Sequence, residues 1–288
     1  MKHPGQDRGS ASRRSILATL TYSDYFNFPL TVEELRTRLI GVSISRRVLT
    51  HELENMIKSS TIEHTGDFYH LFGRKFLISR REELEKHAVP QLARAHALAN
   101  RLGSLPGVKA IFLTGSLAVK NAPEDSDIDF MVITENNRLW TTRFLLTIYC
   151  SLFGLRRTPN SKNNSGKLCL NLFLSPISYL LSPPQRSLYS AYELLQAVPL
   201  YDPQNTRSTL LAANPWINKY LPNFRLPSSR ATRPKPQNWN TGILEYCLYH
   251  LQLAYMRPKI TREHITGTAA FFHPNNPGAE VTKKINEI

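Results

Sequence analysis

The sequence has few cysteines, no long hydrophobic run and no apolar segment near its start. Its three cysteines are Cys150, Cys169 and Cys247. Their odd number and wide spacing argue against a disulfide framework and a zinc motif, and their apolar surroundings predict that all three are core residues. The longest apolar stretches, residues 144–155 and 168–181, are shorter than the ~20 residues of a membrane-spanning helix. The polar first fifteen residues do not resemble a signal peptide, so we expect a cytoplasmic protein without a membrane partner.

Acidic residues are scarce in one part of the chain. The 288 residues contain 36 Lys and Arg against 22 Asp and Glu, which gives a formal net charge of +14. Residues 138–240 alone hold 13 of the basic residues and only 2 of the acidic ones, whereas the remainder is close to balance. This distribution predicts an anionic partner that binds the central part of the chain, and it says nothing about the fold.

The length favours two domains, and the first, residues 12–80, has the pattern of three short helices followed by a β-hairpin. Thr31 and Glu34 form a capping-box sequence at the start of one helix, and Ser45 is placed to cap the next. An alternating stretch then turns around Gly66-Asp67, a dipeptide typical of hairpins. One face of the helix after Ser45 carries apolar residues expected in the core, namely Val48, Leu49, Leu53, Met56 and Ile57. Three helices and a hairpin in this order predict a winged-helix-like domain.

The middle of the chain, residues 81–222, has the pattern of a compact domain of mixed helices and strands. A connecting helix is expected over residues 80–104, with a kink or break at Pro90. The periodicity predicts strands at residues 108–114, 127–134 and 168–174, and helices from residue 115 and at residues 138–155, 187–196 and 206–220. Residues 223–238, rich in Pro, Ser and Arg, are expected to be a linker, and residues 239–288 a mostly helical C-terminal segment.

The most informative stretch contains a glycine-serine pair and, eleven residues later, two aspartates. Gly115 and Ser116 stand where a strand gives way to a short helix, and free backbone amides at such a position favour a phosphate group. Asp127 and Asp129 flank Ile128, so strand alternation places both carboxylates on one face and the isoleucine in the core. Adjacent carboxylates repel one another unless a cation lies between them, which predicts a divalent metal site. Together the two sites predict nucleotidyl transfer from a nucleoside triphosphate (NTP).

The residues Gly115-Ser116 and Ser126-Asp127-Ile128-Asp129, at this spacing, resemble the signature of the polymerase-β-type nucleotidyltransferase superfamily over roughly residues 90–220. The resemblance implies an α+β fold. In it, a polymerase-β-like nucleotidyltransferase domain carries the N-terminal winged-helix-like domain and a C-terminal helical tail, as in bacterial and archaeal members with a helical N-terminal segment. It also implies that Asp127 and Asp129 bind Mg²⁺ or Mn²⁺ and act in catalysis on the NTP.

The chain departs from the family pattern at the third metal-binding carboxylate, which the family carries on the next core strand. That strand has Asn171 where an acid is expected, and no Asp or Glu occurs between Glu135 and Glu193. An amide oxygen can bind the metal with the nucleotide, but it cannot accept the proton of an acceptor hydroxyl. Glu124 and Asp125 either take over this role or lie in an exposed loop.

Five of the basic residues between the strand with the aspartates and the strand with Asn171 are candidates for binding an anion. They are Arg143, Arg156, Arg157, Lys162 and Lys167. Two interpretations stay open for them, because such residues either bind the triphosphate or a polyanionic acceptor, or form an exposed basic surface without a fixed target. Lys120 is nearer to the expected phosphate position and has the same two interpretations.

Two functions are compatible with these observations. The first is a metal-dependent nucleotidyltransferase that moves a nucleoside monophosphate (NMP) from an NTP to an unknown hydroxyl acceptor in a small molecule, a protein or a nucleic acid. The alternative is a catalytically weak or inactive nucleotide-binding regulatory protein with a winged-helix interaction module, which Asn171 favours. Residues 1–84 hold 13 basic and 10 acidic residues, with one suggestive pair, Arg46-Arg47. Strong sequence-specific DNA binding is therefore not expected.

Overall fold

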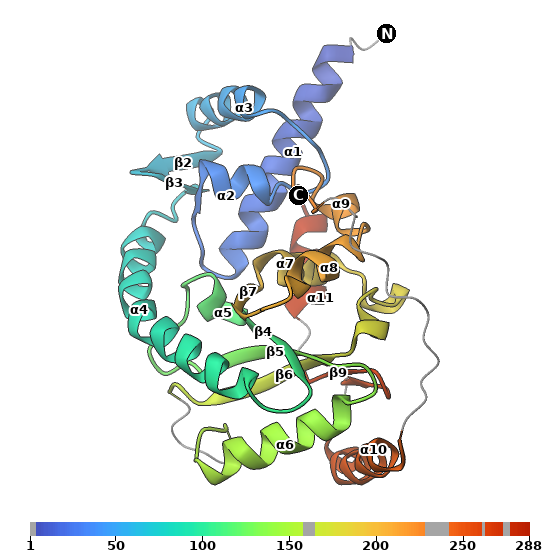
Figure 1. The fold of residues 1–288 in the computed structure, drawn as a ribbon. Helices are drawn as coiled ribbons and strands as arrows, with labels where there is room; N and C mark the ends of the chain where they lie inside the picture. Colours follow the sequence, from blue (N-terminus) through green and yellow to red (C-terminus); the bar gives the residue numbers. More distant parts are fainter. Residues whose placement is uncertain (1–3, 158–164, 228–241, 261–262, 273–276) are drawn as a thin grey trace.

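The computed structural model describes residues 4–157, 165–227, 242–260, 263–272 and 277–288 (Figure 1). Lys162 and most of the expected linker, residues 228–238, lie outside the described residues. Among the helices that are described, none combines the length and the apolar character that a membrane crossing requires.

The N-terminal part contains the expected three helices and hairpin. Its elements are α1 (Pro4–Tyr25), β1 (Leu30–Thr31), α2 (Val32–Thr37), α3 (Arg46–Lys58), β2 (Ile62–Thr65) and β3 (Phe68–Leu71). The strands form an antiparallel sheet in the order β1-β3-β2. Both bonds of the capping box between Thr31 and Glu34 are present, and the Ser45 side chain caps α3. The core contains Leu49, Leu53 and Met56 from α3, but Val48 and Ile57 are exposed, which corrects the predicted apolar face.

Helix α4 (Phe76–Gly103) joins the N-terminal part to the central sheet (Figure 1). It begins before the predicted residue 80 and continues as one helix through Pro90. Its buried Arg81 donates to Glu34 of α2 at 2.9 and 3.0 Å, and the guanidinium lies over the ring of Phe28 at 4.1 Å. Because a buried cation needs both a charged partner and hydrogen-bond acceptors, these contacts fix α4 against the N-terminal part.

The central sheet has six strands in the order β7-β4-β5-β6-β9-β8. They are β4 (Val108–Thr114), β5 (Ile128–Thr134), β6 (Leu168–Leu174), β7 (Val198–Tyr201), β8 (His264–Ile265) and β9 (Ala269–Phe271). Strands β5 and β6 are parallel, and the other neighbours are antiparallel. The short α5 (Gly115–Ala118) follows β4, and α6 (Leu139–Leu152) follows β5. The three strands predicted from the apolar stretches therefore form the middle of the sheet.

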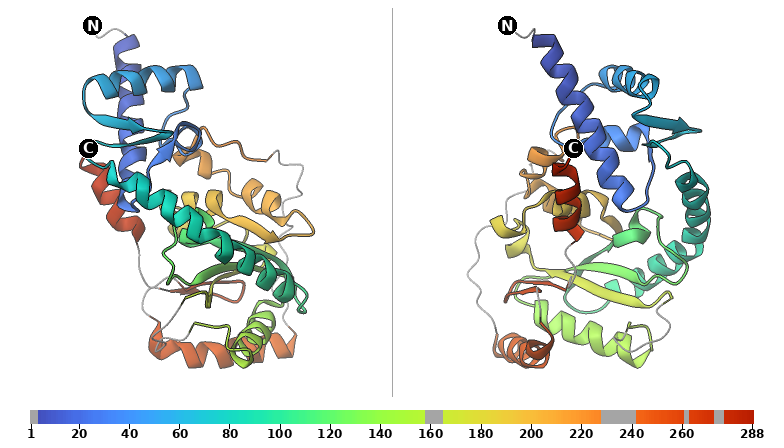
Figure 2. Two further views of the ribbon diagram at one scale, coloured as in Figure 1. Left: turned by 90° about the vertical axis from the view of Figure 1, so that its left-hand side faces the viewer. Right: turned by 180° about the vertical axis from the view of Figure 1, so that it is seen from behind.

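Helices cover both faces of this sheet, as the views in Figure 2 show. One face packs against α4, α6 and α10 (Ile243–Met256). The other packs against α7 (Leu188–Gln196), α8 (Thr206–Ala212), α9 (Ile217–Tyr220), α11 (Pro277–Asn286) and Tyr22 of α1. The predicted helix over residues 206–220 is divided into α8 and α9, with Pro215 between them. Along β5, Ile128 and Phe130 face the first set of helices and Met131 faces the second, so strand alternation assigns Asp129 to the side of α7.

The C-terminal segment is less helical than predicted, because β9 pairs with β6 and β8 extends the sheet at that edge. Helix α10 packs against α6, where buried Glu245 accepts hydrogen bonds from the backbone amides of Trp140 and Thr141 at 2.7 and 2.8 Å. Helix α11 lies beside α1 and α7 (Figure 2). The segment is therefore built into the central fold rather than appended to it.

Candidate active site

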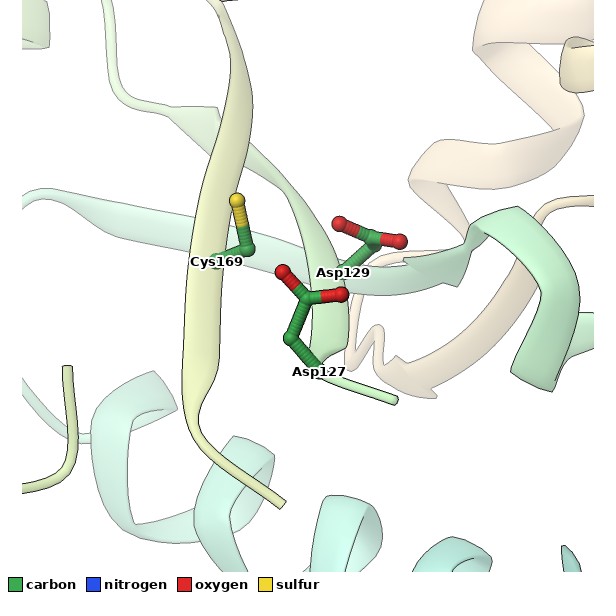
Figure 3. Close-up of side chains that lie close together, drawn as sticks. All are labelled: Asp127, Asp129 and Cys169. Atoms are coloured by element: carbon green, nitrogen blue, oxygen red, sulfur yellow. The ribbon is translucent and has the colours of Figure 1, made fainter. Parts of the chain in front are cut away.

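Two carboxylates project from the start of β5 toward β6. Asp127 immediately precedes the strand, Asp129 is its second residue, and Ile128 between them is fully buried. Figure 3 shows both aspartates beside Cys169 of β6. One carboxylate oxygen of each aspartate and the Cys169 Sγ lie within 4.8 Å of one another. The predicted same-face arrangement of the carboxylates is therefore present, and its oxygen donors fit Mg²⁺ or Mn²⁺.

Gly115 follows β4 and lies directly against Asp129. Its φ of +68° is in the left-handed region, and a Cβ at this position would lie 2.4 Å from Asp129 Oδ2. Thr114 is the register partner of Asp129, so the end of β4 brings the glycine beside the carboxylate. A glycine is required here on both grounds. The Asp129 carboxylate occupies the space that a side chain at position 115 would fill.

Ser116 and Lys120, which are also expected near the phosphates, lie in α5 and in the turn after it. Ser116 is the second residue of α5 and is partly exposed, and its carbonyl accepts from the Asn121 amide at 2.9 Å. Helix α5 ends at Ala118, so Lys120 lies beyond it. Lys120 stands in the following turn with a φ of +57° and is exposed.

Strand β6 brings two residues, Cys169 and Asn171, to the aspartates. Cys169 is the register partner of Asp129, and Asn171 is the extra residue of an irregularity where Phe130 pairs with Leu170 and Met131 with Leu172. A β-bulge of this kind places a side chain where regular alternation would not. The Asn171 Nδ2 donates to Asp129 Oδ1, and the Cys169 Sγ donates to Asn171 Oδ1 at 2.8 Å.

This arrangement corrects the expectation that all three cysteines are core residues. Cys150 is buried, but Cys169 is partly exposed at the aspartate pair and Cys247 is exposed on α10. The apolar sequence around Cys169 predicts a packing residue and does not indicate a ligand. Its position two residues before Asn171, on the same strand, is the signal that could have identified it.

The carboxylate of Asp129 lies in an electrostatically unfavourable environment. Burial raises its pKa most, and the negative charges of Asp127 and Glu193 raise it further, to about 7. Hydrogen bonds from Asn171 and Cys169 act in the opposite direction. Burial and the charges of Asp129 and Asp127 also raise the pKa of the Cys169 thiol, to about 12. A cation between these groups would remove much of the repulsion.

Glu193 on α7 is a further carboxylate near Asp129, and no sequence pattern indicates it. Its charge acts on Asp129, and burial raises its own pKa to about 7, while a hydrogen bond from Tyr189 lowers it. Glu124 and Asp125 are exposed in the loop before β5. Within the described residues, neither they nor Glu193 belong to the group of ligand atoms around Asp127 and Asp129.

Of the five basic residues, Arg157 reaches the aspartates. Its Nη1 donates to Asp127 Oδ2 at 2.6 Å, and its backbone amide donates to the Leu168 carbonyl at the start of β6. Arg143 is instead a packing residue, with Nη1 donating to Gln252 and its guanidinium 4.6 Å from the Phe272 ring centroid. The other two described residues have structural or partly buried positions. Lys167 donates to the Gly154 carbonyl at 2.6 Å, and Arg156 is partly buried.

Comparison with known families identifies the central part of the chain. The family model described as a nucleotidyltransferase domain matches residues 96–168, from the end of α4 through both aspartates to the first residue of β6. The match confirms the resemblance to the polymerase-β-type nucleotidyltransferase superfamily, and it ends before Cys169 and Asn171. No curated protein and no solved structure matches the chain.

Proposed function

We propose that this chain, which carries a nucleotidyltransferase domain of the polymerase-β type in residues 96–168, moves an NMP from an NTP to a hydroxyl group of an acceptor. The observation that carries the proposal is the pair of same-face carboxylates at the start of β5, held against Gly115 at the end of β4. Within a domain of this family, such a pair is suited to divalent metal binding at the triphosphate.

Asp127 and Asp129 would hold Mg²⁺ or Mn²⁺, which supplies positive charge to the phosphates when bound. The residues of the chain then have separate tasks. Gly115 lets Asp129 lie against the backbone at the end of β4. The partly exposed Ser116 offers a hydroxyl donor, and Lys120 and Arg157 offer positive charge to the phosphate oxygens.

The proton of the acceptor hydroxyl lacks an evident recipient beside the aspartate pair. Asn171 donates to Asp129 and cannot take up a proton there. Glu193 is the carboxylate whose charge acts on Asp129 from α7. We therefore propose a slow transfer in which Glu193 or a group of the acceptor takes the proton.

A regulatory function is the second candidate, and the Arg157–Asp127 ion pair favours it. The guanidinium offsets the charge of one of the two carboxylates. Asn171, which stands where the family pattern has a third carboxylate, donates to the other. The N-terminal part has the element order of a winged helix, with Arg46 and Arg47 exposed at the start of α3. In this alternative that part binds another protein, because 10 acidic residues nearly balance the 13 basic residues of positions 1–84 and leave little excess charge for phosphate contacts.

Calorimetric titration with Mg-NTP tests the binding step that both candidates share. We expect the wild type to bind at least one NTP, and the double variant Asp127→Asn/Asp129→Asn to lose metal-dependent binding, because the amides keep the side-chain size and remove the charge. Asp125→Asn is the matched control, since Asp125 is exposed in the same loop. Equal NTP affinity in the double variant and the control would remove the proposed role of the pair.

A further inference from the structure

The residue that faces Asp129 across the β5–β6 pair is a cysteine. Cys169 is in register with Asp129, and its Sγ and the two carboxylates form the group of ligand atoms within 4.8 Å (Figure 3). Asn171 is held to Asp129 through its Nδ2 and to Cys169 through its Oδ1. The Cys169 sulfur and the Asn171 amide oxygen therefore lie beside the two carboxylates. Among the described residues, no third carboxylate belongs to this group of ligand atoms.

The sulfur changes which cation this group of atoms prefers. Mg²⁺ takes oxygen ligands in a strict octahedral arrangement, and a thiol contributes little to its binding. Zn²⁺ and related soft divalent cations bind thiolates strongly and accept carboxylates as further ligands in four-coordinate sites. Two carboxylates and one thiolate also supply enough negative charge to offset the desolvation of a dication in a partly buried site.

We propose that the site binds a thiophilic divalent cation of the Zn²⁺ class through Asp127, Asp129 and Cys169, with the Cys169 thiolate in the place of a third oxygen ligand. On binding, the thiol proton leaves to solvent and the sulfur-to-metal bond forms, so the hydrogen bond to Asn171 Oδ1 is lost. Asn171 then keeps its bond to Asp129 and orients that carboxylate. The inference uses the aspartates of the proposed function, but it does not require that transfer occurs.

The proposal implies a split in metal selectivity. Loss of the sulfur should weaken binding of soft cations much more than binding of Mg²⁺ and Mn²⁺, because these two depend mainly on the carboxylates. Cys169→Ser tests this, since the hydroxyl keeps a donor for Asn171. Cys247→Ser is the matched control, because Cys247 is the exposed cysteine on α10, away from the aspartates in the sequence and on another element.

The experiment is a titration of metal-free full-length protein with Cd²⁺, followed by the ultraviolet thiolate-to-metal charge-transfer band, with Zn²⁺ as competitor. In the wild type and in Cys247→Ser, we expect the band to saturate at one equivalent of Cd²⁺ and to disappear when Zn²⁺ displaces the Cd²⁺. In Cys169→Ser, we expect no band. Mn²⁺ affinity, measured by calorimetry, should be the same in the wild type and Cys247→Ser, and in Cys169→Ser it should fall by a smaller factor than the Cd²⁺ affinity does. Circular dichroism and urea unfolding report whether Cys169→Ser is folded.

Two outcomes separate this inference from the proposed function. If the wild type binds Mn²⁺ at the aspartates but develops no band with Cd²⁺, or if Cys247→Ser removes the band, the thiolate ligand is wrong and the nucleotidyltransferase proposal stands. If neither Mn²⁺ nor Cd²⁺ binds to the nucleotide-free protein, this inference is wrong, and the titration with Mg-NTP, in which the phosphates supply further ligands to the metal, decides the proposed function separately.

Discussion

At the scale of single residues, Gly115 does not tolerate a side chain, because its φ is positive and Asp129 lies against it. We expect Gly115→Ala to lower the free energy of unfolding by about 1–3 kcal/mol from backbone strain alone, and to displace the Asp129 carboxylate that lies 2.4 Å from the added Cβ. Gly154→Ala is the control, because Gly154 has a similar φ of +61° and nothing within 4 Å of its Cβ position. Urea unfolding and Mn²⁺ titration measure the two effects. Equal Mn²⁺ affinity in both variants would contradict the close packing of Gly115 and Asp129.

Arg157 is a further residue with a testable role. Its guanidinium, 2.6 Å from Asp127, competes with a cation for the same carboxylate. Arg157→Gln should therefore raise the affinity for Mn²⁺ in the absence of nucleotide, and Arg156→Gln, one residue away and not paired with the aspartates in the described residues, should change it less. Calorimetry with Mn²⁺ alone measures the difference. A lower affinity in Arg157→Gln would show that the arginine orders Asp127 rather than competing for it.

The buried charge of Asp129 predicts a dependence of stability on pH. Because folding raises the pKa of this carboxyl from 3.8 to about 7, its contribution to stability is fully present below pH 4 and is lost as the pH rises through 7. In metal-free protein, Asp129→Asn should therefore be more stable than the wild type at pH 8, by on the order of 3 kcal/mol, and equally stable near pH 4. Urea unfolding at the two pH values measures this. A wild type that is more stable than the variant at pH 8 without metal would contradict the unfavourable environment of Asp129.

At the scale of elements, one side chain of α10 caps the start of α6. Glu245 is buried and accepts from the first backbone amides of α6 and from the Thr141 hydroxyl, so it caps a helix that is distant in the sequence. Glu245→Ala leaves these donors without their partner and should cost about 1–3 kcal/mol in the free energy of unfolding. Glu245→Gln keeps an acceptor oxygen and should recover part of the loss. Equal stability of the alanine variant and the wild type would show that the cap is dispensable.

The elements that the sequence predicted best are those with strong local signals. Strands β4, β5 and β6 lie at or within one residue of their predicted bounds, because their apolar stretches are bounded by polar or turn residues. The caps at Thr31 and Ser45 are local too. Strands β8 and β9 were missed because two and three residues carry no periodicity, and they form through pairing with β6.

The candidate site divides in the same way. Alternation around Ile128 was sufficient to place Asp127 and Asp129 together. The contribution of Cys169 and Asn171 depends on the irregular pairing between β5 and β6, which no local pattern indicates. The ion pair of Arg157 and the proximity of Glu193 arise from tertiary packing, so neither could be assigned from the sequence.

At the scale of the whole molecule, specific contacts attach the N-terminal part to the helices around the central sheet. Tyr22 of α1 stacks on Tyr192 of α7 with ring centroids 3.9 Å apart, and Asn121, close to the phosphate positions expected after β4, donates to the Phe26 carbonyl. Tyr192 also donates to the Arg38 carbonyl at 2.7 Å. These contacts lie on α7, next to Glu193, and in the turn after α5. The N-terminal part therefore contacts the elements on either side of the candidate site.

Transfer of an NMP differs from transfer of a terminal phosphate in which phosphorus atom of the NTP enters the product, so a labelled α-phosphate and a labelled γ-phosphate distinguish the two reactions. Each NTP, labelled at the α- or at the γ-phosphate, is incubated with the protein, Mg²⁺, Mn²⁺ or Zn²⁺, and a cell extract as source of acceptors. We predict that the α-label of at least one NTP enters a product, that the γ-label leaves with pyrophosphate, and that Asp127→Asn/Asp129→Asn abolishes transfer while Asp125→Asn does not. Transfer of the γ-label, or α-label transfer that persists in the double variant, would contradict the account.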